Sequence, residues 1–161
     1  MDYKDFLSVL DKRLSAYFED HKDFIHCKIG CSDCCKAGDY PMSQLEFDYI
    51  MRGYIDLDEQ KKQIVKTNIE HSEKGGMCPF LVNEECSIYP YRPIVCRVHG
   101  LAYKTKNIVK IPYCANKDKN YANVYKNNEI IVEPIAENLD TPEILKGIEY
   151  GEIRNLFDWL K

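Results

Sequence analysis

The chain has 161 residues, of which 45% are hydrophobic and 30% charged, so one globular domain over residues 1–161 with a substantial core is expected. Its formal net charge of -4 lacks the basic surplus that nucleic-acid binding normally shows, and no run of apolar residues is long enough to span a membrane. The N-terminal residues lack the apolar segment of a signal peptide, so we expect a cytoplasmic protein.

The first predicted element is an amphipathic helix over residues 3–24. Apolar side chains recur there every three or four residues, and Asp and Lys occupy the other face. The repeating apolar positions are Phe6, Leu10, Leu14, Tyr17 and Phe18.

Two more helices are predicted between the cysteine-rich segments of the chain. Ser43 and Glu46 have the spacing of a capping box, which predicts a helix over residues 44–54. Asp56 and Glu59 suggest a second box, followed by a helix over residues 57–72 that is stopped by Gly75-Gly76.

The first cysteine-rich segment holds Cys27, Cys31, Cys34 and Cys35. In an α-helix, these spacings would place all four thiols on one face. In a looped segment, Gly30 would allow a tight turn, and nearby backbone amides could donate hydrogen bonds to the sulfurs. Either conformation presents a group of thiolates, so both stay open at this point.

The second cysteine-rich segment carries Cys78, Cys86 and Cys96 at wider spacing, and Cys114 follows a short apolar run. Residues 80–89 can form a small hairpin or a pair of extended pieces. The dipeptide Arg92-Pro93 predicts an extended residue followed by a short helix that holds Cys96.

The remainder of the chain predicts short strands and a second helical part. Residues 101–103, 108–111 and 130–132 are strand-like, and residues 115–128 form a polar loop or an irregular helix. A helix start at residues 140–143 is followed by an amphipathic helical part, with Gly147 and Gly151 as weak points. The expected fold class is mainly α with a few short β-strands, in a small single domain organised round a cysteine-rich metal site.

Eight cysteines in a cytoplasmic chain favour a metal or cluster site over a disulfide framework, because that compartment keeps thiols reduced. Thiolates are soft ligands that suit tetrahedral zinc or an iron–sulfur cluster and suit magnesium and calcium poorly. The set allows two four-sulfur sites, one site with spare thiols, or a multinuclear cluster, and we expect both segments to contribute to one composite centre. The candidate metal ligands are Cys27, Cys31, Cys34, Cys35, Cys78, Cys86, Cys96 and Cys114.

Two arginines and two histidines flank these cysteines. The guanidinium groups of Arg92 and Arg97, on either side of Cys96, could offset the charge of a thiolate-rich site or form surface ion pairs. His99 is a candidate ligand three residues after Cys96, whereas His26 is interpreted as a bystander.

Two further alternatives stay open. The spacing Cys27-x3-Cys31-x2-Cys34 is the one with which radical S-adenosylmethionine enzymes hold a four-iron cluster, although this chain is short and lacks their strand–helix alternation. A thiol redox sensor would use Cys34 or Cys35. An ordinary hydrolase or NTPase is not indicated, because the sequence has no phosphate-binding loop, nucleophile elbow or zinc-protease motif.

At these cysteines the sequence resembles the YkgJ-like cysteine-cluster family, also called the CxxCxxCC family. One signature is Cys27-x3-Cys31-x2-Cys34-Cys35, with three residues where the family name has two between the first pair. The other runs from Cys78-Pro79-Phe80-Leu81 through Cys86-Ser87-Ile88-Tyr89 and Arg92-Pro93 to Cys96-Arg97. The signatures cover residues 27–97, and with Cys114 the motif core is expected to span residues 27–114.

The resemblance implies a protein that chelates zinc or iron through its eight cysteines, with Arg92 and Arg97 around the site. Flagellin lysine methylases carry a similar cysteine cluster, which implies an alternative: an iron–sulfur protein with a [4Fe-4S] cluster and redox or methyl-transfer activity. Whether the protein is an enzyme stays open, since no methyl-donor motif is visible. The expected partner is a metal ion, without nucleic acid or a membrane, and no protein partner is specified.

Overall fold

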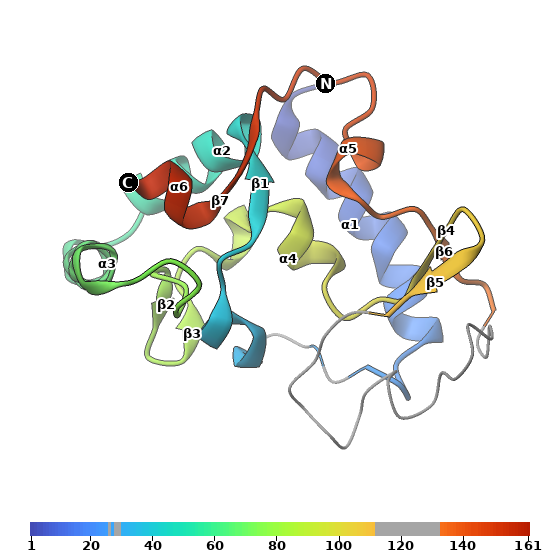
Figure 1. Ribbon diagram of the computed structural model, residues 1–161, viewed down its shortest axis with the longest axis horizontal. Helices are drawn as coiled ribbons and strands as arrows, with labels where there is room; N and C mark the ends of the chain where they lie inside the picture. The colour runs from blue at the N-terminus through green and yellow to red at the C-terminus, as the bar shows by residue number, and fades with distance from the viewer. Residues whose placement is uncertain (26, 28–29, 112–132) are drawn as a thin grey trace. The chain divides into compact units, whose positions relative to one another are not determined.

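The computed structural model describes residues 1–25, 27, 30–111 and 133–161 (Figure 1). The chain divides into two compact units, each assembled from segments that are distant in sequence. Unit 1 comprises Met1–Cys27 and Arg97–Leu139, and unit 2 comprises Lys28–Cys96 and Asp140–Lys161. The expectation of a single domain over the whole chain stays a prediction.

Unit 1 begins with the long helix α1, Tyr3–Asp20. The Asp2 carboxylate caps this helix by accepting a hydrogen bond from the backbone N–H of Asp5 at 2.8 Å. The helix ends four residues before the predicted end, at the buried ring of His21, whose Nε2 lies 2.8 Å from the backbone oxygen of Pro134. The predicted apolar face is confirmed in part: Leu10 and Leu14 are buried, together with Leu7, which was not among the predicted positions.

A small three-stranded sheet completes the described part of unit 1. Strand β4, Tyr103–Thr105, pairs with antiparallel β5, Ile108–Lys110, on one side and with parallel β6, Ala136–Glu137, on the other. The two strands predicted at 101–103 and 108–111 are therefore confirmed, although the first begins two residues later than expected. The predicted loop at 115–128 and the predicted strand at 130–132 lie outside the described residues.

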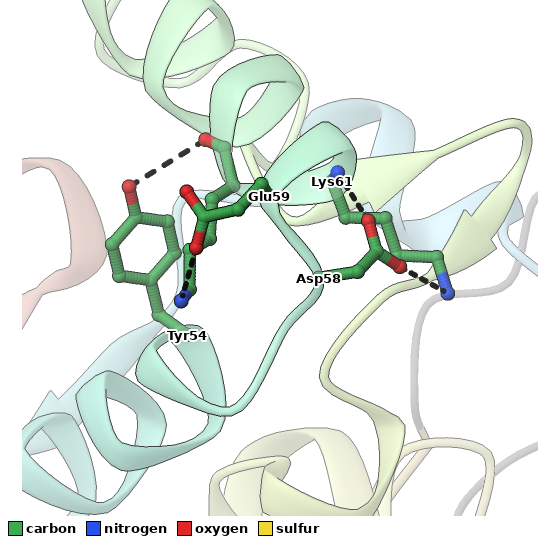
Figure 2. A network of polar contacts seen from close by, with 5 residues as sticks. Tyr54, Asp58, Glu59 and Lys61 are labelled. Carbon is green, nitrogen blue, oxygen red and sulfur yellow. Dashed lines mark hydrogen bonds and ion pairs between the residues drawn. The ribbon is translucent and has the colours of Figure 1, made fainter.

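Two helices form one side of the core of unit 2. The capping box is confirmed at the start of α2, Gln44–Ile55, where the side chains of Ser43 and Glu46 each accept a hydrogen bond from the other's backbone N–H. The second predicted box is wrong: α3, Glu59–His71, is capped by Asp58, whose carboxylate accepts a hydrogen bond from the Lys61 backbone N–H at 2.8 Å (Figure 2). Asp56 instead ends α2 and accepts a hydrogen bond from the Tyr91 hydroxyl.

The C-terminal part is less helical than predicted. Helix α5, Thr141–Ile144, is a single turn, and positive φ angles at Gly147 (87°) and Gly151 (72°) separate it from strand β7, Ile153–Asn155. This strand pairs antiparallel with β1, Pro41–Ser43, and leads into the short helix α6, Leu156–Leu160 (Figure 1). Residues Ile153–Asn155 were expected to continue a helix. They form a strand instead, because β1, which is distant in sequence, pairs with them.

The core of unit 2 packs side chains of β1, α2, α3 and α6 against side chains from the second cysteine-rich segment. Among the described residues, three elements carry cysteines: the 3-10 helix η1, Asp33–Ala37, the hairpin of β2, Leu81–Val82, and β3, Glu85–Cys86, and helix α4, Ile94–Val98. The 3-10 helix η2, Tyr89–Tyr91, lies between the hairpin and α4. Buried core residues are Met42, Ile50, Val65, Phe80, Val82, Ile88 and Leu156. The expectation of a mainly helical chain with a few short strands is confirmed. In the described ranges, no helix combines the length and apolar character needed to cross a membrane.

Candidate metal centre

The end of the first cysteine-rich segment lies beside the start of the second in unit 2. The backbone N–H of Cys78 donates to the carbonyl of Cys35 at 2.8 Å, and the N–H of Gly38 donates to the carbonyl of Gly76 at 2.9 Å. Gly38 allows this approach because it lacks a side chain: a Cβ there would lie 2.9 Å from the Cβ of Cys78. Residues that are 38 and 43 positions apart in sequence are thus held together by main-chain hydrogen bonds.

The first segment adopts a loop followed by a 3-10 helix. Gly30 has a φ of 91°, and the backbone N–H of Cys35 donates to the Ser32 carbonyl at 2.9 Å as η1 begins. Of the two conformations left open by the sequence, the described residues therefore match the loop better than a continuous α-helix. Cys34 and Cys35 both lie on η1.

The second segment uses tight turns to direct backbone amides at sulfur. Burial raises the pKa of the Cys78 thiol to about 12, and hydrogen bonds from the backbone N–H groups of Phe80 and Leu81 oppose that rise. Burial likewise raises the pKa of the Cys86 thiol, and a hydrogen bond from the backbone N–H of Ile88 opposes that rise. A hairpin, one of the two arrangements that the sequence left open, places Cys86 opposite Leu81. These amides favour the thiolate, which is the form that binds a metal.

Cys96 lies on α4, which follows the extended residue Arg92 as predicted. Burial raises the pKa of its thiol well above the ordinary value, and the neighbouring thiolates of Cys78, Cys86 and Cys34 raise it further. Four cysteines from four places in the sequence therefore affect one another electrostatically. We refer to Cys34, Cys78, Cys86 and Cys96 as the thiol cluster.

The guanidinium group of Arg92 supplies positive charge to the thiol cluster. It lowers the pKa of both Cys86 and Cys96, against the larger effect of burial. Its Cζ lies 3.5 Å from the centroid of the Tyr89 ring, a cation–π contact that holds the group in place. The expected role of Arg92 beside the cysteines thus has a structural basis in unit 2.

Arg97 makes a different contact. Its side chain is 4% exposed and forms an ion pair with Asp11 of α1, with Nη1 and Oδ2 2.5 Å apart. This pair belongs to unit 1, together with His99 and Cys27. The Cys27 sulfur lies 2.6 Å from the position that a Cβ on Gly100 would occupy. Cys114 and His26 lie outside the described residues.

Two residues beside the cluster were not identified as site residues from the sequence. The Tyr40 hydroxyl donates to the backbone oxygen of Cys34 at 3.0 Å, and burial together with the nearby cysteine thiolates raises the pKa of the phenol. Glu46, assigned only to a helix cap, also accepts a hydrogen bond from the backbone N–H of Ile94 at 2.8 Å, at the start of α4. The Tyr40 contact spans six positions and the Glu46 contact 48, and neither belongs to a motif or periodic pattern that the sequence reveals.

The donor chemistry of the thiol cluster fits a soft metal ion. Its four side chains are thiols, and backbone amides and one guanidinium group lie where they offset negative charge on sulfur. Within the ranges that the structure describes, no three histidine, cysteine or carboxylate side chains are grouped closely enough to hold a metal ion as they stand. Coordination would therefore require the sulfurs to move together.

A family model for the CxxCxxCC domain matches residues 26–115, more than half of the chain. The chain belongs to the CxxCxxCC family. The family is described as a "Putative zinc- or iron-chelating domain", and the matched range includes all eight cysteines, which confirms the resemblance seen in the sequence. Neither the curated proteins nor the solved structures contain a match to the chain.

Proposed function

We propose that this CxxCxxCC protein is a cytoplasmic metal-binding protein that chelates zinc or iron through clustered cysteine thiolates. The thiol cluster supplies the central ligands, and Cys27, Cys31, Cys35 and Cys114 are further candidates. The observation that carries the proposal is the mutual effect of four cysteines drawn from η1, the turn at Cys78, strand β3 and helix α4.

The chemistry of these thiols favours chelation over nucleophilic catalysis. A thiol whose pKa is raised by burial is mostly protonated at neutral pH and is a poor nucleophile. A metal cation would displace these protons and replace repulsion between thiolates with attraction to a shared positive charge. The amides near Cys78 and Cys86 and the guanidinium of Arg92 would remain to offset the surplus negative charge of a tetrathiolate.

The metal would also have a structural role. The candidate ligands come from segments that the fold holds together with few local contacts: η1 is five residues long, and β2 and β3 have two residues each. A cation shared by these segments would add cross-links inside unit 2. All-thiolate zinc sites commonly stabilise a fold in this way.

Metal and acid-labile sulfide content, measured on protein purified without oxygen, tests the proposal. One or two zinc ions per chain and no sulfide would support a zinc-chelating protein. About four irons and four sulfides with absorbance near 400 nm would instead support the alternative, an iron–sulfur protein with redox or methyl-transfer activity. A chain that carries no metal and takes up neither zinc nor iron would overturn the proposal. Reversible disulfides in that metal-free chain would favour the thiol sensor.

A further inference from the structure

The C-terminal residues contact the stretch of chain that follows the first cysteine-rich segment. Residues 153–161, here called the C-terminal clamp, comprise β7, α6 and Lys161. They lie outside the range 26–115 that the family model matches, yet they belong to the same compact unit as the thiol cluster. The clamp is thus a feature of this chain beyond the matched domain.

Two consecutive residues of the clamp donate hydrogen bonds to the stretch just before β1. The backbone N–H of Leu156 donates to the Tyr40 carbonyl at 3.0 Å, and the N–H of Phe157 donates to the Asp39 carboxylate at 3.2 Å. The pairing of β1 with β7 extends these contacts through Ser43. Residues 39–43 are therefore held in place mainly by a segment more than one hundred positions away.

Tyr40 connects this arrangement to the cysteines. Its main chain is held by Leu156, and its hydroxyl donates to the backbone oxygen of Cys34 at 3.0 Å. Cys34 is the member of the thiol cluster that η1 contributes, and η1 is a short 3-10 helix whose N-cap lacks a side-chain hydrogen bond. The Tyr40 hydroxyl thus joins the clamped stretch to the turn that presents the Cys34 thiol.

We infer that Tyr40 is a positioning residue that couples the C-terminal clamp to metal binding at Cys34. The inference rests on the proposed function. A clamp that is closed on residues 39–43 holds Tyr40, and Tyr40 holds the turn that carries Cys34 near the other thiols of the cluster, which limits how far Cys34 must move to bind a metal. By reciprocity, a metal that fixes Cys34 stabilises the closed clamp by the same free energy.

The chain contains a built-in reporter for this coupling. Trp159, in α6, is its single tryptophan. The indole Nε1 donates to the Met42 carbonyl at 3.1 Å, and the ring stacks on Phe47 with centroids 5.4 Å apart. Any change in how the clamp sits on β1 alters the surroundings of the only indole, and so alters its fluorescence.

The test is a zinc titration of the full-length chain, with a chromophoric chelator to measure affinity and Trp159 emission to follow the clamp. Tyr40→Phe removes the hydroxyl and keeps the ring. We expect it to weaken zinc binding roughly threefold to tenfold, the effect of one hydrogen bond, and to lose most of the zinc-induced emission change seen in the unaltered chain. Circular dichroism checks that each variant is folded.

Tyr54→Phe is the matched control. Tyr54 lies in the last turn of α2. Its hydroxyl also donates to a backbone carbonyl, that of Lys62, at 3.5 Å (Figure 2). This change should leave zinc affinity and the emission response as they are. A second pair of variants tests the contact between the clamp and Asp39. Asp39→Ala removes the acceptor for the Phe157 N–H and should weaken zinc binding. Asp39→Asn keeps an acceptor oxygen and should keep the zinc affinity of the unaltered chain.

Each outcome decides the matter. If zinc binds but Tyr40→Phe and Asp39→Ala keep full affinity, the coupling is wrong and the proposed function stands. The same holds if zinc binds to the unaltered chain without changing Trp159 emission. If Tyr54→Phe weakens zinc binding as much as Tyr40→Phe does, the effect is general destabilisation and the assignment of Tyr40 fails. If the unaltered chain binds neither zinc nor iron, the proposed function and the coupling fail together.

Discussion

The carboxylate of Glu46 links two helix N-termini. One oxygen accepts hydrogen bonds from the backbone N–H and the hydroxyl of Ser43, each at 2.7 Å, and the other accepts from the backbone N–H of Ile94 at 2.8 Å. The side chain is almost fully buried, and its negative charge faces the positive ends of α2 and α4. This single residue therefore fixes the helix that carries Cys96 against the helix that follows the first cysteine-rich segment.

Replacing Glu46 with Ala should destabilise the metal-free protein by about 2–4 kcal/mol, because the buried N–H groups of Ser43 and Ile94 would both lose their acceptor. Urea unfolding measures the loss. Glu59→Ala is the control, since Glu59 also stands in a first helical turn (Figure 2), but its side chain is 91% exposed. That change should cost less than about 0.5 kcal/mol. Equal effects at the two sites would contradict the role given to Glu46.

Replacing Gly38 with Ala should weaken both folding and metal binding. The new Cβ would lie 2.9 Å from the Cβ of Cys78 and 3.0 Å from the Cys35 carbonyl, so the two cysteine-rich segments would be pushed apart. We expect a loss of about 1–3 kcal/mol in unfolding free energy, together with weaker zinc binding.

Gly147→Ala separates crowding at the cysteines from backbone strain. No atom lies within 4 Å of a Cβ at Gly147, but its φ of 87° disfavours a side chain. This variant should lose about 1 kcal/mol of stability and keep its zinc affinity. Unchanged metal binding in Gly38→Ala would show that the approach of the two segments is irrelevant to the site.

Replacing Cys34 with Ser should remove bound metal and the stability that the metal supplies. Saturating zinc stabilises a folded binder by about 4 kcal/mol when free metal exceeds Kd a thousandfold, and this gain should be missing from the variant. Thermal melts with and without zinc measure it. Ser32→Ala alters the N-cap of the same 3-10 helix, where no side-chain cap is formed, and should keep the zinc-dependent gain. A zinc-dependent gain of normal size in Cys34→Ser would remove Cys34 from the ligand set.

Zinc affinity should rise with pH. The pKa of Cys78 is about 12 and those of Cys86 and Cys96 are also raised, so these thiols are protonated in the metal-free protein at neutral pH and each must release a proton to bind. Competition titrations between pH 6.5 and 8, a range below the ordinary thiol pKa of about 8.5, measure the slope. A pH-independent affinity would mean that thiols of raised pKa are not the ligands.

The metal-free protein should respond to pH in the opposite direction. Because folding raises the pKa of these thiols, their contribution to stability is fully present below the ordinary thiol pKa of about 8.5 and is lost as the pH rises toward the folded value. Urea midpoints of metal-free protein should therefore fall between about pH 8.5 and 10. Midpoints that rise over this interval would contradict the burial of the thiol cluster.

Local signals in the sequence predicted the elements that local contacts form. The capping box of Ser43 and Glu46 and the hairpin before Tyr89 depend on residues within a few positions of one another, and both are present. Spacing alone could not show which acidic residue before α3, Asp56 or Asp58, caps that helix. The Tyr91 hydroxyl, 35 positions away, donates to Asp56 and leaves Asp58 as the cap.

The contacts that assemble the site were not predictable from spacing. The C-terminal part has the apolar pattern of a helix, yet Ile153 to Asn155 form a strand because β1 offers them a partner. Tyr40 and the second contact of Glu46 have no periodic or motif signal. The cysteine pattern did predict the family, because a motif is read from sequence alone, but the selection of Cys34, Cys78, Cys86 and Cys96 required the fold.

X-ray absorption at the zinc edge of the zinc-loaded full-length chain is the most direct test of metal binding by the thiol cluster. We expect a first shell of four sulfur atoms at about 2.3 Å. In the Cys96→Ser variant, the same spectrum should lose one sulfur or the zinc altogether. A first shell dominated by nitrogen or oxygen at about 2.0–2.1 Å would contradict the account, as would four sulfurs that persist when Cys96 is replaced.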